Sequence, residues 1–294
     1  MPKILLVAGT HGNEHAAVAA TTYVFNKLNG NNDLTFFLIN MPGLAANTRE
    51  YPNPPEATRD LNRAFSSESK IDWMEQDINS LKIAINSADI VVDVHNSPAC
   101  DNAILVSNNN HAIPYIRFAK RHRLGYLLRE SEANTIKKYA ISRGKPGFTV
   151  ELGGMGYGPE FDTVFKGQTE FLKNFVKSLL YLDCVDPFFS DDYRPLPQQY
   201  NMIPLYVHAT GLVKYRAKLG MPVKAGDPIL DVVSRVNEVL ETVPAPCDCR
   251  LADCETNLWV TPGFNVCSVQ PVIPDSVLVR TPHPAGTSGL IIET

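Results

Sequence analysis

Three features missing from this sequence narrow what the protein can be. No run of apolar residues reaches the roughly 18 needed to cross a bilayer, so we expect no membrane-spanning helix and no membrane partner. No stripe of lysine and arginine stands out, and the formal net charge is −4, which argues against a nucleic-acid partner. The apolar N-terminal stretch is short and has no small-residue cleavage site, which indicates a first β-strand and a cytoplasmic location.

Cysteine is sparse, and its spacing carries little information. The chain has 6 cysteines, which we expect to be reduced thiols rather than a disulfide framework. Cys247, Cys249 and Cys254 lie close together in the sequence. Their spacing differs from the usual C-x₂-C of structural metal sites, and no fourth partner follows at a matching distance. We therefore interpret them as partly buried thiols on strands.

The rest of the composition is typical of a globular protein. With 294 residues, of which 44% are hydrophobic, the chain can form one large core and a smaller one. Up to about residue 180, strand-like apolar runs alternate with helix-like stretches, which predicts an α/β fold: a mostly parallel or mixed twisted sheet with helices on both faces. We expect strands at Ile4–Ala8, Leu34–Ile39, Ile90–Val94 and Phe148–Val150, and helices at His15–Leu28, Ile71–Ser87, Ile113–His122 and Thr169–Leu182.

The pattern changes after residue 185. Prolines punctuate the next stretch, and beyond it short β-type runs are separated by glycine and proline turns, with no helical period. We therefore predict two domains. Residues 1–190 form the α/β domain, and residues 195–294 form a small all-β domain of barrel or sandwich type.

Reactive side chains follow the predicted strands of the α/β domain. His11 and Glu14 come directly after Ile4–Ala8, three residues apart, and His95 follows Ile90–Val94. The carboxyl ends of parallel strands form the ligand-binding edge of such a sheet, so these side chains can meet there. Two histidines and one glutamate are the ligands of a catalytic zinc site, so we expect one Zn²⁺ per chain. Alternatively, His11 and Glu14 stabilise a helix N-terminus and His95 is hydrogen-bonded at a strand end.

Glu151 follows the strand Phe148–Val150 within an apolar run. A carboxylate in such surroundings needs a reason, and a general base that activates water and then protonates a leaving amine would provide one. The alternative is a salt bridge to a lysine or arginine. Asp93 lies two residues before His95 and could orient that histidine as a hydrogen-bond acceptor.

Arginines offer sites for anionic groups. Arg63 could bind a substrate carboxylate bidentately, with Asn62 sharing the group, although an Asp60–Arg63 pair that holds a loop explains the same residues. Arg49 could steady a developing oxyanion. Arg59 and Arg143 are rivals for that role.

The motifs H-G-N-E, D-L-N-R, D-V-H and V-E-L-G occur in an order that resembles the succinylglutamate desuccinylase/aspartoacylase family, relatives of carboxypeptidase A. The resemblance covers the N-terminal 180 residues, and the C-terminal segment is similar to the small β domain of that family. It implies a zinc carboxypeptidase-like fold. It also implies that zinc is held by His11, Glu14 and His95, that Asn62 and Arg63 bind the substrate carboxylate, and that Glu151 is the base.

Some residues depart from the family pattern. Five residues, Tyr51-Pro52-Asn53-Pro54-Pro55, follow close after Arg49, which indicates an insertion between this arginine and D-L-N-R. No clear counterpart exists for the arginine that reads a second acidic group in aspartoacylase, although Arg143 could serve. The residues after Glu151 look more like those of the desuccinylases. The acyl group and the amino acid therefore stay open.

The sequence thus predicts a zinc-dependent amidohydrolase. Metal-activated water would cleave the non-peptide amide C–N bond of a small N-acyl amino acid, similar to N-acetylaspartate or N-succinylglutamate. The chain could also form a homo-oligomer. Two alternatives remain: a metallocarboxypeptidase that acts on a short or cell-wall peptide, and a non-catalytic binding module.

Overall fold

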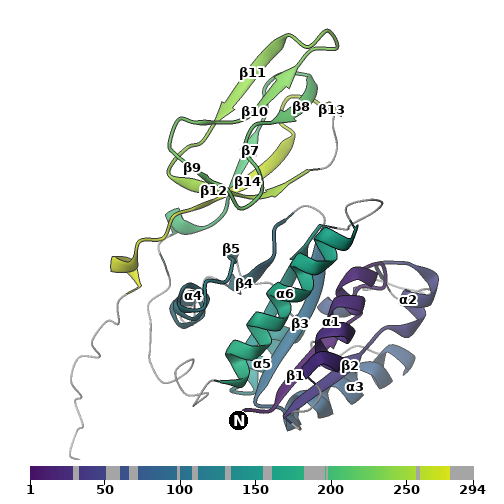
Figure 1. The fold of residues 1–294 in the computed structure, drawn as a ribbon. Coiled ribbons are helices and arrows are strands. Elements are labelled where there is room, and N and C mark those ends of the chain that lie inside the picture. Colours follow the sequence, from purple (N-terminus) through teal and green to yellow (C-terminus); the bar gives the residue numbers. More distant parts are fainter. Residues whose placement is uncertain are drawn as a thin grey trace, which may run out of the picture.

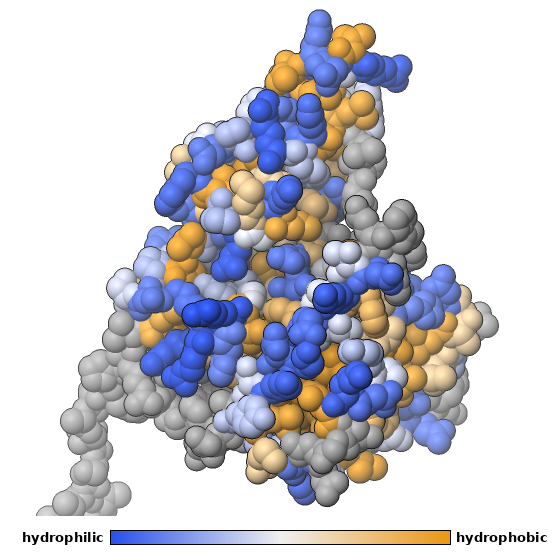
Figure 2. All heavy atoms as spheres, viewed as in Figure 1, coloured by the Kyte–Doolittle hydropathy of each residue, from blue (hydrophilic) through white to orange (hydrophobic). Residues whose placement is uncertain are grey.

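The computed structural model (Figure 1) describes residues 1–28, 33–50, 60–65, 72–97, 100–107, 112–129, 134–154, 161–181, 196, 198–255 and 259–278. Within these residues, the chain forms a sheet covered by α-helices, followed by two smaller sheets that have no α-helices packed between or beside them in the sequence. No helix of the described residues is long and apolar enough to cross a membrane. Figure 2 shows hydrophobic residues dispersed among hydrophilic ones over the face in view.

The large sheet has six strands in the order β2-β1-β3-β6-β4-β5. The strands β1, β2, β3 and β6 run parallel, whereas β4 is antiparallel to β6, so the sheet is mixed. Strand β1 is a continuous apolar run because both of its faces are buried, and β3 is also buried along almost its whole length. The bounds are β1 (Ile4–Ala8), β2 (Leu34–Leu38), β3 (Ile90–Ser97), β4 (Ala103–Ser107), β5 (Tyr126–Arg129) and β6 (Gly147–Gly153).

Helices cover both faces of this sheet, which confirms the predicted fold class. On one face, α1, α4 and α6 bury apolar side chains in the largest core, where Phe118, Phe148 and Phe175 pack edge to face or tilted. On the other face, α3 and α5 enclose a second core with β1 and β3. The bounds are α1 (His15–Leu28), α2 (Met41–Ala46), α3 (Asp72–Ser87), α4 (Ala112–Arg121), α5 (Ile136–Ser142) and α6 (Phe161–Leu180).

The structure differs from the predicted elements in several places, among them two helices, α2 and α5, that were not predicted. Strand β3 continues beyond His95 to Ser97 because it keeps pairing with β6. Helix α6 begins at Phe161, eight residues before the predicted Thr169. Strands β4 and β5 were not predicted. The insertion proposed at residues 51–55 lies outside the described residues.

The C-terminal part consists of two antiparallel sheets in the orders β11-β10-β8-β13 and β7-β14-β12-β9. Alternating side chains from both sheets share one apolar core, as in a sandwich. The bounds are β7 (Ile203–Tyr206), β8 (Gly211–Tyr215), β9 (Pro222–Val223), β10 (Pro228–Val233), β11 (Val239–Pro244), β12 (Cys249–Cys254), β13 (Trp259–Val260) and β14 (Asn265–Pro271).

The segments that precede and follow these sheets in the sequence both pack against the main core. Leu196 and Tyr200 (in the 3₁₀ turn Gln198–Tyr200) pack against it before β7, and Ile273 and Leu278 do so after β14. Lys120 of α4 donates a hydrogen bond to the carbonyl of Ile273 at 2.7 Å. The division into domains at residues 190 and 195 stays a proposal, since residues 182–195 lie outside the described part of the chain.

Candidate metal centre and active site

His11 and Glu14 lie on the tight turn between β1 and α1. The backbone N–H of Glu14 donates to the carbonyl of His11 at 3.2 Å, which brings the two side chains to the same side. Between them, Gly12 packs against the backbone of α2, where a Cβ atom would lie 2.1 Å from the carbonyl carbon of Gly43. Only glycine fits this contact, so the turn that aims His11 depends on it.

His95 and Glu151 come from the neighbouring parallel strands β3 and β6. They stand directly opposite each other in the register, so their side chains point to the same face. The extra residues of β3 also contribute, because the backbone N–H of Asn96 donates to Glu14 Oε2 at 3.2 Å. The backbone of β3 thereby helps to fix the position of the Glu14 carboxylate.

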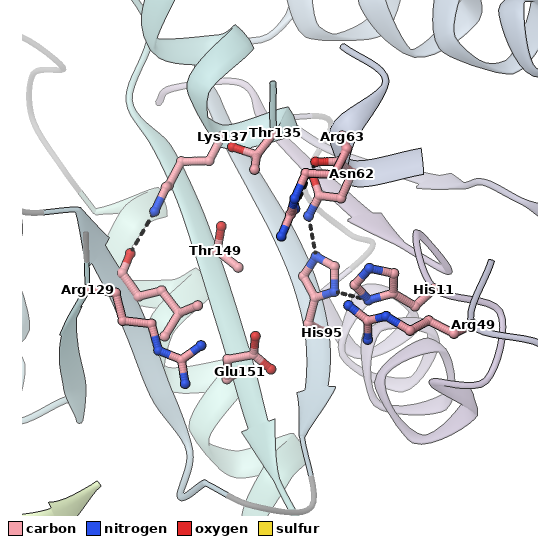
Figure 3. Close-up of a pocket in the computed structure, with 11 residues that line it drawn as sticks. His11, Arg49, Asn62, Arg63, His95, Arg129, Thr135, Lys137, Thr149 and Glu151 are labelled. Carbon is pink, nitrogen blue, oxygen red and sulfur yellow. Dashed lines mark hydrogen bonds between the residues drawn. The ribbon is translucent and has the colours of Figure 1, made fainter. Parts of the chain in front are cut away.

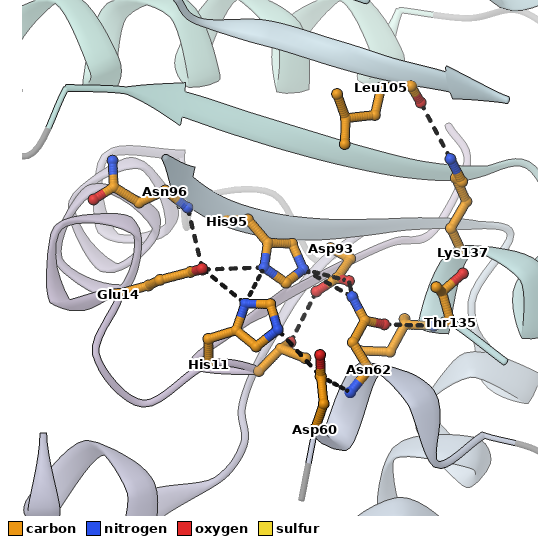
Figure 4. Close-up of polar contacts among 12 residues, drawn as sticks. His11, Glu14, Asp60, Asn62, Asp93, His95, Asn96, Leu105, Thr135 and Lys137 are labelled. Carbon is orange, nitrogen blue, oxygen red and sulfur yellow. Dashed lines mark hydrogen bonds and ion pairs between the residues drawn. The ribbon is translucent and has the colours of Figure 1, made fainter. Parts of the chain in front are cut away.

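The side chains of His11, Glu14 and His95 converge on one point, and all three are buried (Figure 4). His11 Nδ1 lies 2.7 Å from Glu14 Oε1, and His95 Nδ1 lies 3.0 Å from Glu14 Oε2. The two Nδ1 atoms are 3.1 Å apart. Two imidazole nitrogens facing each other beside a carboxylate are arranged to share a cation, so these residues could hold a metal ion. Among the described residues they form the one such cluster.

A second carboxylate lies behind each histidine. His95 Nε2 is 2.7 Å from Asp93 Oδ2, and His11 Nε2 is 3.2 Å from Asp60 Oδ1. Asp93 also accepts hydrogen bonds from Thr10 Oγ1 at 2.9 Å and from Asn62 Nδ2 at 3.2 Å. Carboxylates at Nε2 keep the proton on that nitrogen and leave Nδ1 free as a metal ligand.

The site has strongly shifted proton affinities. Burial would raise the pKa of Glu14, but His95 and His11 outweigh it and lower that pKa to about 2. Burial would lower the pKa of His95, but the charges of Asp93 and Glu14 raise it well above its ordinary value. Burial raises the pKa of Glu151, and His95 opposes this shift only in part. Glu151 is therefore more readily protonated than an ordinary carboxylate.

A cavity of about 110 Å³ opens beside the metal-ligand cluster (Figure 3). Because one water needs roughly 10–15 Å³, this space suits a small molecule. Most of the lining is polar, with an excess of positive charge. The lining residues are His11, Arg49, Asn62, Arg63, His95, Leu105, Arg129, Thr135, Lys137, Thr149 and Glu151.

The predicted substrate-binding pair lies on the short 3₁₀ turn Leu61–Arg63, which Asp60 caps by accepting from the backbone N–H of Asn62 at 2.9 Å. Arg63 faces the cavity. Asn62 lines it as well, but its amide is engaged within the protein: Oδ1 accepts from the backbone N–H of Ile136 at 3.0 Å, and Nδ2 donates to Asp93. Arg63 also has a contact within the protein, because its Nη1 donates to the backbone carbonyl of Asn62 at 3.0 Å while its side chain lines the cavity.

The structure separates two of the three candidate oxyanion arginines. Arg49 lines the cavity, 3.6 Å from Glu14 Oε1 and 3.8 Å from Asp60 Oδ2. Arg143 is not among the lining residues: it caps the C-terminus of α5, exposed, with its guanidinium 5.0 Å from the ring centroid of Tyr139. Arg59 lies outside the described residues.

Several site residues were missed in the sequence. Asp60 was considered only as a possible partner of Arg63, and its contact with His11 was not predicted. Arg129 ends β5, a strand that was not predicted, and Lys137 lies at the start of α5. The available signal for Arg129 was a charged residue at the end of the apolar run Tyr126–Leu128.

Comparisons with known proteins identify the family. Residues 1–176 match the model of the succinylglutamate desuccinylase/aspartoacylase catalytic domain. Among curated proteins, no sequence match was found.

Solved structures share the fold at low identity. An aspartoacylase family protein from Mesorhizobium loti is 17% identical with a TM-score of 0.65, covering 93% of this chain and 86% of that one. The product-bound ectoine utilization protein EutE (DoeB) from Ruegeria pomeroyi is 18% identical with a TM-score of 0.61, covering 92% and 85%. A succinylglutamate desuccinylase from a Silicibacter species is 18% identical with a TM-score of 0.61, covering 92% and 86%. The matched residues make up more than half of the chain, which therefore belongs to the succinylglutamate desuccinylase/aspartoacylase family.

Proposed function

We propose that this protein is a zinc-dependent amidohydrolase that deacylates a small N-acyl amino acid. The observation that carries the proposal is the convergence of His11 Nδ1, His95 Nδ1 and the Glu14 carboxylate, with Glu151 on the adjacent strand. The names of the relatives, a desuccinylase and an aspartoacylase, support cleavage of an acyl group from an amino acid.

The donor atoms fit zinc. Two neutral imidazoles and one carboxylate are the protein ligands of many catalytic zinc sites, which keep a fourth position open. Asp60 and Asp93 contact Nε2 of His11 and His95, respectively. Carboxylates in this position commonly orient the histidine ligands of zinc sites. When bound, zinc would supply Lewis acidity, polarising a carbonyl and lowering the pKa of water towards neutrality.

Glu151 would move the protons. It faces the cavity opposite His95, so it can accept a proton from the attacking water and then donate it to the leaving amine nitrogen. Its raised pKa suits both steps, because the protonated carboxyl forms more readily than at an ordinary glutamate.

Two arginines would bind the charged parts of the substrate. The Arg63 guanidinium can hold the α-carboxylate of the amino acid through paired hydrogen bonds. Arg49 lies next to Glu14 and would stabilise the negative charge that develops on the acyl oxygen. The cavity admits one small molecule, which favours an N-acyl amino acid over a polypeptide.

The test is hydrolysis by the zinc-loaded protein of acetyl and succinyl derivatives of acidic, basic and aromatic amino acids, with short and cell-wall peptides alongside. We expect release of a free amino acid from one N-acyl class. Cleavage of peptides alone would instead indicate a metallocarboxypeptidase, and full zinc occupancy without hydrolysis a binding module. Glu151→Gln should keep zinc and lose about 10²- to 10⁴-fold in rate, whereas His95→Ala should lose both zinc and activity.

A further inference from the structure

Two cysteines of the C-terminal sheets face each other from neighbouring strands. In the antiparallel register of β12 and β14, which lie side by side in Figure 1, Cys254 stands directly opposite Cys267. Both side chains belong to the apolar core between the two sheets, and both thiols are free in the structure. Residues directly opposite each other on antiparallel strands point to the same face, so the two sulfur atoms lie on one side of the sheet. These two residues are termed the cross-strand pair below.

The hydrogen bonds of the ladder show which kind of pair the two cysteines form. The backbone N–H of Glu255 donates to the carbonyl of Val266 at 2.9 Å, so the pair next to the cysteines is a hydrogen-bonded one. The two kinds of pair alternate along an antiparallel ladder, so the cross-strand pair is a non-hydrogen-bonded one. In such a pair the Cα atoms lie about 4.5 Å apart, within the roughly 4.4 to 6.8 Å that a disulfide spans. The backbone is therefore already placed for a bond between the two sulfur atoms.

Tyr215 of β8, in the facing sheet, holds this end of the ladder in place. Its hydroxyl donates to the carbonyl of Val266 at 2.7 Å, and the carbonyl of Glu255 lies 3.3 Å from the same oxygen. Burial raises the pKa of the phenol, and the two thiols of the cross-strand pair add to this shift because they lie close to the ring. One side chain thus contacts both strands beside the two cysteines and opposes a slip in their register.

A different pair of thiols lies at the start of β12. The thiols of Cys247 and Cys249 are hydrogen-bonded to each other. They flank Asp248, which pairs with Lys224 at 2.8 Å, away from the cavity. A bond between Cys247 and Cys249 would join residues two positions apart on one segment, so it would constrain no contact between strands. Only a bond within the cross-strand pair would tie β12 to β14.

We infer that the cross-strand pair is an oxidation site, at which a peroxide converts the thiols of Cys254 and Cys267 into a disulfide. Cys254 is half-buried and Cys267 is buried, so the peroxide reaches Cys254 first. The Cys254 thiolate attacks one peroxide oxygen: an S–O bond forms, the O–O bond breaks, and the leaving hydroxide takes up the proton that the thiol lost. The sulfur of Cys267 then attacks the sulfenic acid: the S–S bond forms, the S–O bond breaks, and the hydroxyl leaves as water with the proton of Cys267. Two thiols and one peroxide give one disulfide and two waters.

The surroundings of the two thiols set the pace of this reaction. Burial raises the pKa of both, that of Cys267 to about 12. Little thiolate is then present near neutral pH, and the thiolate is the nucleophile. We therefore expect the disulfide to form more slowly than with exposed cysteines, which suits a response to sustained oxidation.

The disulfide would form where the C-terminal sheets meet the cavity. Asp253, the residue before Cys254, lies 3.6 Å from the guanidinium of Arg129, which lines the cavity. The backbone of Asp253 also forms a β-bridge with Cys100 of the main part of the chain. A bond from Cys254 to β14 would fix the end of β12 that makes these contacts. Because it also closes the loop of residues 254–267 in the unfolded chain, we expect it to raise the melting temperature by roughly 5 to 10 °C.

The experiment is mass spectrometry of the full chain after treatment with hydrogen peroxide and alkylation of the remaining thiols. Trypsin cuts after Arg235, Arg250 and Arg280, so Cys254 and Cys267 fall in one peptide, 251–280, and the other pair in peptide 236–250. We expect peptide 251–280 to lose two hydrogens and to resist alkylation until it is reduced with dithiothreitol.

Variants distinguish the two steps of the reaction. Cys267→Ala should stop at the sulfenic acid of Cys254, which dimedone traps, whereas Cys254→Ala should leave the buried thiol of Cys267 unmodified. Cys247→Ser is the matched control and should form the cross-strand disulfide at the wild-type rate. Melting temperatures before treatment establish that each variant is folded.

Three results would overturn the inference. Peptide 251–280 of the wild type could keep both thiols after prolonged treatment, gain oxygen without losing two hydrogens, or be bonded to peptide 236–250. A rise in melting temperature as large in treated Cys254→Ala as in the treated wild type would also contradict it. None of these measurements involves hydrolysis of a substrate, so the oxidation site and the proposed function stand or fall separately.

Discussion

Asp93→Asn tests whether the carboxylates behind the histidines control metal binding. Asp93 is fully buried and contacts His95 Nε2 at 2.7 Å. Asparagine has the same shape. Its Oδ1 can accept from His95 and its Nδ2 can donate to Thr10, so the change removes the charge and leaves the packing.

The expected size of the effect follows from the geometry. Loss of a group that orients a metal-binding histidine typically weakens metal affinity 10- to 100-fold, or about 1.4 to 2.8 kcal/mol. Asp93 should lie at the upper end because its contact is short and excludes solvent. Asp60 contacts His11 at 3.2 Å and its side chain is 19% exposed, so Asp60→Asn should lie at the lower end.

The assay is competition for zinc with a chromophoric chelator, performed on the wild type, Asp93→Asn, Asp60→Asn and the control Asp248→Asn. Circular dichroism and melting temperature establish that each variant is folded. We expect affinity to fall in the order wild type, Asp60→Asn, Asp93→Asn. Equal zinc affinity for all four proteins, or a larger loss for Asp60→Asn, would refute the argument that contact length and burial set the effect.

Three further predictions concern the same site. The acid limb of the pH–rate profile should lie above pH 4.5, since burial raises the pKa of Glu151 and only its ionised form can accept a proton; a limb that persists unchanged in residual Glu151→Gln activity would assign it to another group. Arg49→Met should lower kcat about 10²- to 10³-fold with zinc content unchanged, as measured by steady-state kinetics and metal analysis; a loss confined to KM would contradict the oxyanion role. Gly12→Ala should lower zinc affinity and melting temperature together, because the added Cβ meets Gly43, and an unaffected variant would show that the turn can move.

The three residues that could hold a metal ion were brought together by the sequence argument because their positions depend on local sequence. His11 and His95 each follow an apolar run, and parallel strands bring their carboxyl ends to one edge. Glu151 followed from the same rule. That His95 and Glu151 stand directly opposite each other required the register of β3 and β6, which periodicity does not give.

The residues that were missed depend on tertiary contacts. The contact of Asp60 with His11 spans 49 positions of sequence, and no local pattern distinguishes it from a pair with Arg63. Arg129 reaches the cavity because β4 reverses direction against β6 and carries β5 with it. The sequence around Arg143 gave no sign that this side chain stacks on Tyr139 instead.

After β14 the chain packs against the main core again, which limits how the C-terminal sheets can move. Because the C-terminal sandwich is attached to the main core through Leu196 on one side and through Ile273 and Leu278 on the other, it cannot swing on a single flexible joint. The part of the sandwich that lies behind Arg129 therefore keeps its position relative to the main core. A swing of the C-terminal sheets as one body is therefore not expected during turnover, and the wall of the cavity behind Arg129 would keep its position while ligands enter and leave.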